Sequence, residues 1–174
     1  MNTFTYQDDL FLKLIYDIIY SKSNVMKVFY VTNRRHCSYN NKPAKASFIA
    51  DVRSEFGHKY AHLYSGLPTE DKTLKAHIVY IHQLKENDTP DADNLSKPLI
   101  DAFCGIIYKD DNQVISRKAE IIKLKDFNFM TVDATDMPLE VLNDFNNFYI
   151  HKEKHILYLG IADFLPSQIK IGEL

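Results

Sequence analysis

Hydrophobic residues recur at helical spacing in two parts of the N-terminal half. In residues 6–21 they form one continuous stripe, which predicts an amphipathic helix that packs against the core or another subunit. In the second part, apolar residues recur every four positions and predict a helix that starts at the N-cap Ser47 and ends near Gly66. The polar and basic residues 33–46 are predicted to form a loop before this helix.

Segments rich in β-branched and aromatic residues are predicted to be strands, at 25–32, 73–84, 113–124 and 155–164. The strand at 73–84 is apolar on both faces near its end, which indicates a central position in a sheet. Residues 138–148 are predicted to form a short acidic helix. No internal repeat is present.

A further helix is predicted after Asp93. Its buried stripe consists of Leu95, Leu99, Ala102, Phe103 and Ile106. Because proline is tolerated only near a helix start, Pro98 places the N-terminus of this helix near residues 93–95. Lys97 then lies on the first turn, and Asp101, four residues later, shares a face with it.

Carboxylates flank this helix on both sides. Asp91 and Asp93 lie at its start, and Asp110 and Asp111 lie in the polar turn after it. If the chain brings both pairs together, they repel each other unless they are protonated or bound to a cation. Hard carboxylate oxygens select Mg²⁺ or Mn²⁺, and with Lys97 nearby such a site suits phosphodiester hydrolysis. The spacing fits equally well a solvated acidic turn and helix cap without chemistry.

Other motifs give weaker indications. A calcium-binding EF-hand loop starting at Asp91 would need Gly and Glu where the chain has Ser96 and Ala102. Two histidine pairs with a spacing of four, His58 with His62 and His151 with His155, suggest metal ligands, but ordinary surface or partly buried histidines are the favoured interpretation.

Length and composition also predict where in the cell the protein is located. The 174 residues suffice for one domain, and no apolar run approaches the ~18 residues of a spanning helix. Asp8 and Asp9 precede the first apolar stretch, unlike the basic start of a signal peptide. With only Cys37 and Cys104, we expect a cytoplasmic protein with reduced thiols and no membrane contact.

Charge is unevenly distributed although the net charge is only −2. Residues 21–60 hold eight Lys and Arg against two acids, whereas residues 126–150 hold five acids and no Lys or Arg. The basic segment either forms a phosphate-binding face or is a solvated surface on which charges cluster.

The acidic stretch resembles the RusA family of Holliday-junction resolvases, endonucleases typical of bacteria and their prophages. The shared motif consists of Asp91-Ala92-Asp93-Asn94, Lys97-Pro98, Asp101-Ala102-Phe103 and Asp110-Asp111-Asn112-Gln113-Val114. The resemblance covers roughly residues 27–125 as a nuclease core. Residues 1–24 and 126–174 are additions to the family pattern.

The resemblance implies a compact α/β (α+β) fold with a mixed sheet flanked by helices. It also implies that Asp91, Asp93 and Asp111 bind Mg²⁺, for which Mn²⁺ is a substitute, with Asp110 as a further candidate ligand. Lys97 would assist catalysis, with Asp101 as its support.

The implied substrate is branched DNA, above all the four-way junction. A homodimer would cut it by paired nicks in recombination and repair. The basic residues that would contact the DNA phosphates are Arg34, Arg35, Lys42 and Lys45. The alternative is a module that binds branched DNA or a partner without cutting.

Overall fold

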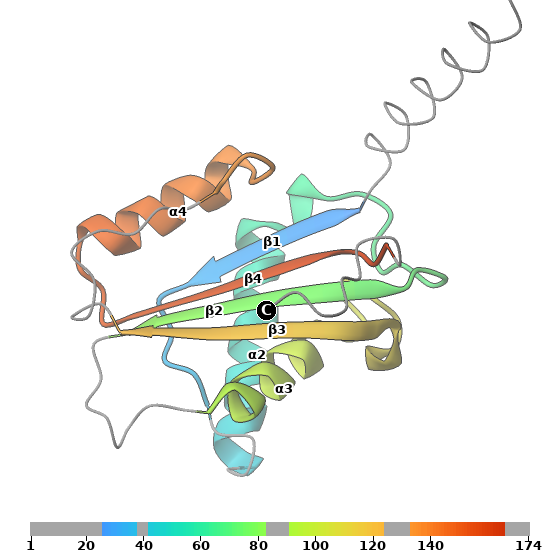
Figure 1. Ribbon diagram of the computed structural model, residues 1–174, viewed down its shortest axis with the longest axis horizontal. Helices are drawn as coiled ribbons and strands as arrows, with labels where there is room; N and C mark the ends of the chain where they lie inside the picture. The colour runs from blue at the N-terminus through green and yellow to red at the C-terminus, as the bar shows by residue number, and fades with distance from the viewer. Residues whose placement is uncertain (1–25, 38–41, 83–90, 124–132, 166–174) are drawn as a thin grey trace, which may run out of the picture.

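In the described part of the chain, four strands form one mixed sheet in the order β1-β4-β2-β3 (Figure 1). The strands are β1 (Lys27–Thr32), β2 (Leu74–His82), β3 (Val114–Lys123) and β4 (His155–Asp163). β2 and β3 run parallel, and β4 is antiparallel to both β1 and β2. The four predicted strands and the interior position of the second are confirmed.

The computed structural model describes residues 26–37, 42–82, 91–123 and 133–165. The helix predicted for residues 6–21 lies outside these ranges. Within them, no helix is both long and apolar enough to cross a membrane.

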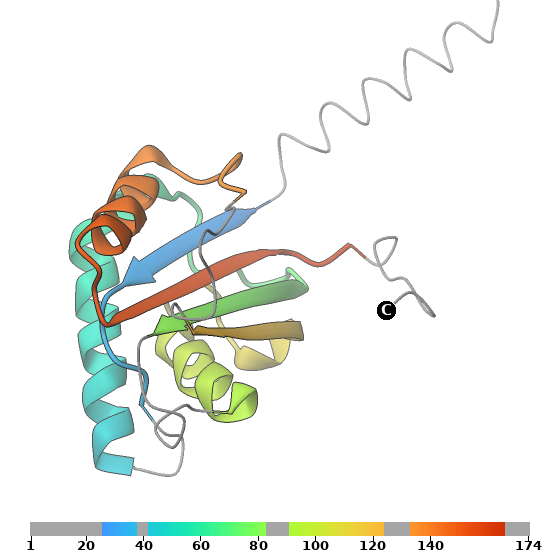
Figure 2. The ribbon, with the colours of Figure 1, turned by 60° about the vertical axis from the view of Figure 1, so that its left-hand side comes forward.

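The described helices are α2 (Lys42–Lys59), α3 (Ala92–Phe103) and α4 (Leu139–Ile150). α2 and α3 cover one face of the sheet, and α4 lies beside β1 (Figures 1 and 2). Fully buried aromatic rings join the two layers, because Tyr30 of β1 contacts Phe56 of α2 and Phe103 of α3 at centroid distances of 6.3 and 5.3 Å. The predicted mixed sheet flanked by helices is confirmed, as is the helix at 138–148.

The prediction of Ser47 as an N-cap is wrong. α2 begins at Lys42, so residues 42–46 are helical rather than part of a loop. Pro43 suits the first turn of a helix, because the N–H it lacks has no helical partner there. α2 also ends earlier than predicted, at Lys59, and a 3₁₀ turn, η1 (Ala61–Leu63), follows.

The helix after the acidic pair starts one residue earlier than predicted and ends at Phe103, so Ile106 lies outside it. Its stripe residues Leu95, Leu99, Ala102 and Phe103 are buried, as predicted. Pro98 lies in the second turn, where it cannot donate to the carbonyl of Asn94.

The C-terminal part of the chain supplies an interior strand. β4 lies between β1 and β2 and pairs with both along its length. In three dimensions, therefore, β1, β2 and β3 of the segment 27–125 share one sheet with β4 of the addition 126–174.

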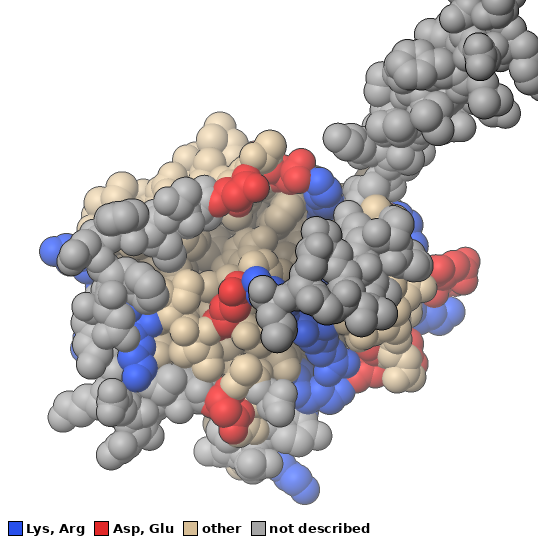
Figure 3. All heavy atoms as spheres, in the orientation of Figure 1, with Lys and Arg blue, Asp and Glu red and all other residues tan. Residues whose placement is uncertain are grey.

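The other face of the sheet carries the alternate residues of each strand. Phe29, Gly160, His77 and Lys118 form one row across all four strands. The ring of Tyr158 lies over Gly160, where a Cβ atom would come within 2.5 Å of the tyrosine Oη. Figure 3 looks onto this face, on which acidic and basic side chains are interspersed.

Candidate active site

Asp91 fixes the start of α3. Its carboxylate accepts hydrogen bonds from the backbone N–H of Asn94 at 2.7 Å and from the Asn94 side-chain amide at 3.0 Å. This is the usual role of an N-cap aspartate, and the positive end of the helix dipole favours its charge. Asp93 is the second residue of α3 and lies one helical turn before Lys97. The described residues do not include the Asp93 side chain.

Lys97 connects α3 to the distant acidic turn. Its Nζ donates a short hydrogen bond to Asp111 Oδ2 and a second one, at 2.9 Å, to Asp101 Oδ1. The hydrogen bonds to Asp111 and Asp101 raise the pKa of Lys97, and the bond from Lys97 lowers the pKa of the Asp111 carboxyl. Both groups are therefore charged at neutral pH. About a third of each side chain, 32%, is exposed, so a substrate can reach the pair.

α2 holds the other end of α3 in place. Lys45 Nζ lies 2.5 Å from Asp101 Oδ2. Arg53 donates to the carbonyl oxygens of Asp101, Ala102 and Cys104 at 3.3, 2.8 and 2.9 Å. These carbonyls belong to the helix end, where no helical N–H reaches them and a cation is favoured. α2 thus positions both the backbone and the side chain of Asp101, and the predicted contact between Asp101 and Lys97 is confirmed.

The two aspartates of the turn after α3 have different roles. Asp110 caps the short 3₁₀ helix η3 (Asp111–Gln113) by accepting from the Asn112 N–H at 2.8 Å. Gln113 accepts from the N–H groups of Lys109 and Asp110 at 2.9 and 3.0 Å. Its amide donates to the carbonyl of Lys72 at 3.0 Å, just before β2. Asp110 and Gln113 build the turn, and Asp111 projects from it to Lys97.

The donor chemistry around Lys97 suits a hard cation. Asp111 and Asp101 already hold one positive group, the Lys97 ammonium, between them. Asp91 contributes a further exposed carboxylate at the start of α3. Among the described side chains, no group of three or more His, Cys, Asp and Glu is arranged to hold a metal ion. Carboxylate oxygens are the ligands that Mg²⁺ prefers, so the residue types fit this ion.

Residues 50–131 match the family model described as endodeoxyribonuclease RusA. The matched segment contains most of α2 and all of β2, α3 and β3, and with them Asp91, Lys97 and Asp111. Over these residues the chain is similar to the RusA family. No curated protein matches the chain. The resemblance predicted from the acidic motif is therefore confirmed by the family match, and the family is one that acts on branched DNA junctions.

The basic residues predicted to contact DNA lie before the matched segment and have different surroundings. Arg34 forms ion pairs with Glu55 at 3.1 Å and with Asp51 at 3.2 Å, and Lys45 forms an ion pair with Asp101. Arg35 and Lys42 are exposed. Contact of these four residues with DNA remains a prediction.

The predicted histidine pairs do not lie on shared helices. His58 is in α2 but His62 is in η1, and His151 follows α4 whereas His155 begins β4. The structure instead places His155 beside Tyr80 of β2, with the phenol oxygen 2.8 Å from His155 Nδ1 and 3.4 Å from His36 Nδ1. A periodicity argument could not find this cluster, because its members come from three separate strand ends.

The cluster around Tyr80 predicts acid sensitivity. Burial, together with the charge of Arg35 and the neighbouring His155 and His82, lowers the pKa of His36 to about 4. Burial and Arg35 also lower the pKa of His155. In the unfolded chain these histidines bind protons near pH 6.5, whereas in the folded chain they bind them only at lower pH. The folded state therefore has its full stability above pH 6.5 and loses stability as the pH falls towards 4.

Between pH 7 and pH 5 we expect the free energy of unfolding to fall by about 1 kcal/mol, because solvent screens a half-exposed group. This loss corresponds to a fall of roughly 2–4 °C in the melting temperature. Thermal unfolding followed by circular dichroism across this range measures the effect. His36→Gln should flatten the dependence, and an equally steep dependence in that variant would contradict the assignment.

Arg117 of β3 lies in the strand predicted at 113–124, but the sequence predicted no role for it. It pairs with Ala76 of β2, which is buried beneath the helices. Since paired residues point to the same face, Arg117 is directed towards the α3 side of the sheet. The alternation of the strand, with Ala119 and Ile121 on the same face, is the signal that could have found it.

Proposed function

We propose that this protein is a Mg²⁺-dependent, structure-selective endonuclease. It cuts branched DNA, above all four-way junctions, by phosphodiester hydrolysis in recombination and repair. The observation that carries the proposal is the ion pair between Lys97 and Asp111. It joins the two halves of the acidic motif at a position that solvent can reach.

Lys97 is the residue that contacts the reacting phosphate. Its ammonium group donates to a non-bridging oxygen, on which negative charge develops as water attacks phosphorus. Asp111 and Asp101 keep Lys97 protonated, because their hydrogen bonds raise its pKa. Lys45 and Arg53 hold Asp101, so α2 orients Lys97 indirectly.

Asp91, Asp93 and Asp111 are the residues that would hold Mg²⁺, and Asp110 is a further candidate whose carboxylate already caps the turn. Mg²⁺ held there would supply the activation of water and the offset of charge on the leaving oxygen. Mn²⁺ offers similar coordination chemistry and should substitute for it.

A homodimer is part of the proposal. A four-way junction presents two equivalent strands to be cut, and a two-fold pair of subunits carries two equivalent sites. The paired nicks would then be symmetric across the junction.

The purified chain and a synthetic four-way junction test the proposal. We expect two symmetric nicks in Mg²⁺ or Mn²⁺ and none in EDTA, with little cutting of a linear duplex of the same sequence. Asp93→Asn should abolish cleavage with the circular dichroism spectrum unchanged.

The alternative outcomes are distinct. A junction that is bound but intact in both metals would make the chain a binding module. Equal cutting of junction, duplex and RNA at several salt concentrations would replace junction resolution with a general nuclease activity.

A further inference from the structure

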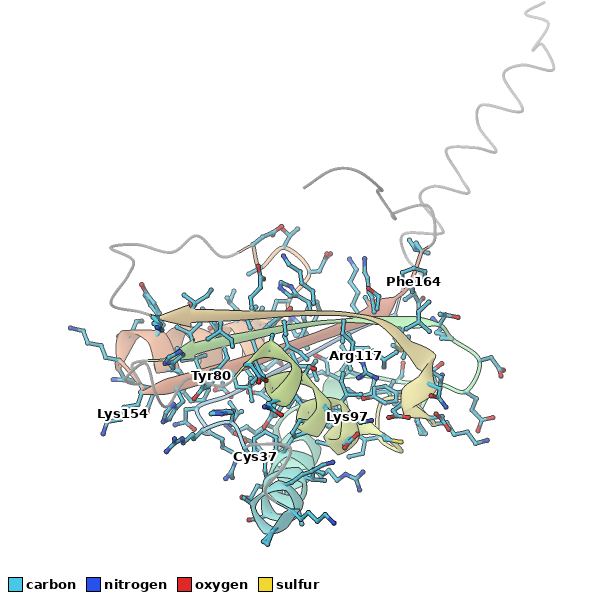
Figure 4. The ribbon with its side chains drawn as sticks, turned by 60° about the horizontal axis from the view of Figure 1, so that its bottom comes forward. Cys37, Tyr80, Lys97, Arg117, Lys154 and Phe164 are labelled. Atoms are coloured by element: carbon cyan, nitrogen blue, oxygen red, sulfur yellow. The ribbon has the colours of Figure 1, made fainter. Side chains whose placement is uncertain are left out.

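Arg117 lies close to the ion pair of Lys97 and Asp111 without bonding to it. Its positive charge contributes to lowering the pKa of the Asp111 carboxyl. It also opposes the rise that burial causes in the pKa of Tyr108, whose hydroxyl donates to the Ile100 carbonyl of α3 at 2.5 Å. In Figure 4, Arg117 and Lys97 both lie on the side of the sheet that carries α3. The guanidinium group therefore belongs to the surroundings of the candidate active site.

The other cations around α3 already have partners. Lys97 is bonded to two carboxylates, Lys45 to Asp101, Arg53 to the end of α3, and Lys109 to Glu70 at 3.3 Å. Within the described residues, Arg117 makes no hydrogen bond or ion pair, and its side chain is exposed. All five of its donors are thus available to an incoming group.

The chemistry of that group follows from the guanidinium. Its planar fork matches two oxygens of a phosphate and remains charged at any physiological pH. A DNA strand whose scissile phosphate lies at Lys97 brings further backbone phosphates along the neighbouring surface. We propose that Arg117 is a phosphate-binding residue that positions the DNA strand beside the Lys97–Asp111 pair. This role rests on the proposed action on DNA.

Lys118 provides a matched control on the same strand. It pairs with His77 and so points to the opposite face of the sheet, where it bonds to Glu120 at 3.1 Å. Arg117→Met and Lys118→Met each remove one positive charge from β3, but only Arg117→Met removes it from the α3 side. A nonspecific effect of net charge would therefore appear equally in Lys118→Met.

The test is the salt dependence of junction binding in Ca²⁺, followed by fluorescence anisotropy between 50 and 300 mM NaCl. We expect Arg117→Met to weaken binding about tenfold at low salt and to reduce the slope of log K against log salt by about 0.9, the value for one phosphate contact. Arg117→Lys should keep the slope but bind more weakly, because lysine cannot make the bidentate contact. Lys118→Met should stay within about twofold of the parent.

Two outcomes overturn the inference: an unchanged affinity and slope in Arg117→Met, or an equal loss in Lys118→Met. The proposed nuclease activity can fail separately. If the parent binds junctions without cutting them and Arg117→Met still loses one unit of slope, the phosphate contact stands and the nuclease proposal falls. Matching melting temperatures of all variants exclude a folding defect.

Discussion

Replacing Lys97 with methionine is expected to reduce the rate of junction cleavage at least about a hundredfold, the usual cost of removing one donor to a developing negative charge. Methionine keeps most of the length and apolar volume of the side chain but cannot donate to Asp111, to Asp101 or to a phosphate. The measurement is single-turnover cleavage of a four-way junction at saturating protein in Mg²⁺.

The fold should survive this change. The Lys97 side chain is partly exposed, and surface ion pairs contribute only about 0–1 kcal/mol. We therefore expect an unchanged circular dichroism spectrum and a melting temperature within a few degrees of the parent.

Lys109→Met is the matched control. Lys109 lies in the turn that carries Asp111, but its partner is Glu70 and both side chains are about two-thirds exposed. This variant should cut within about twofold of the parent. If Lys97→Met cuts as fast as the parent, or if Lys109→Met loses as much, Lys97 does not have the proposed role.

Local patterns in the sequence predicted the elements of the site. The helix of Lys97 and Asp101 follows from apolar spacing, and their contact follows from a separation of four residues. The convergence of Lys97 with Asp111 does not follow from spacing, because η3 and its hydrogen bonds fix the direction of that carboxylate. The family motif alone led us to expect Asp111 at this end of α3, beside Asp91 and Asp93.

Contacts between distant segments were beyond the sequence argument. Arg53 was counted among the basic residues of one segment, yet it donates to the end of a helix about fifty residues away. The start of α2 was missed because Ser47 gave a strong local capping signal, whereas the structure uses the first-turn Pro43. Local propensity identifies what a residue is suited to, and tertiary packing decides which of several suitable positions is used.

Removing β4 by ending the chain after Glu153 is expected to abolish cooperative folding. The strand pairs with β2 at nine positions and with β1 at six, and its buried residues are Ile156, Leu157, Leu159 and Ile161. At about 1.5–3 kcal/mol for each buried aliphatic side chain, their loss removes roughly 6–12 kcal/mol. The whole stability of a domain is only about 5–15 kcal/mol. Thermal and urea unfolding, followed by circular dichroism, measure the effect.

A pair of point variants assigns the effect to β4 itself rather than to the length of the chain. Leu157→Asp places a charge at a fully buried position of β4, whereas Leu139→Asp changes a residue of α4 that is 67% exposed. We expect the first variant to lose cooperative unfolding and the second to keep it. A truncated chain that still unfolds cooperatively would mean that residues 1–153 fold without β4. The expected result means instead that the matched segment 50–131 carries the motif, while the sheet that holds β2 beside α3 requires a strand from outside it.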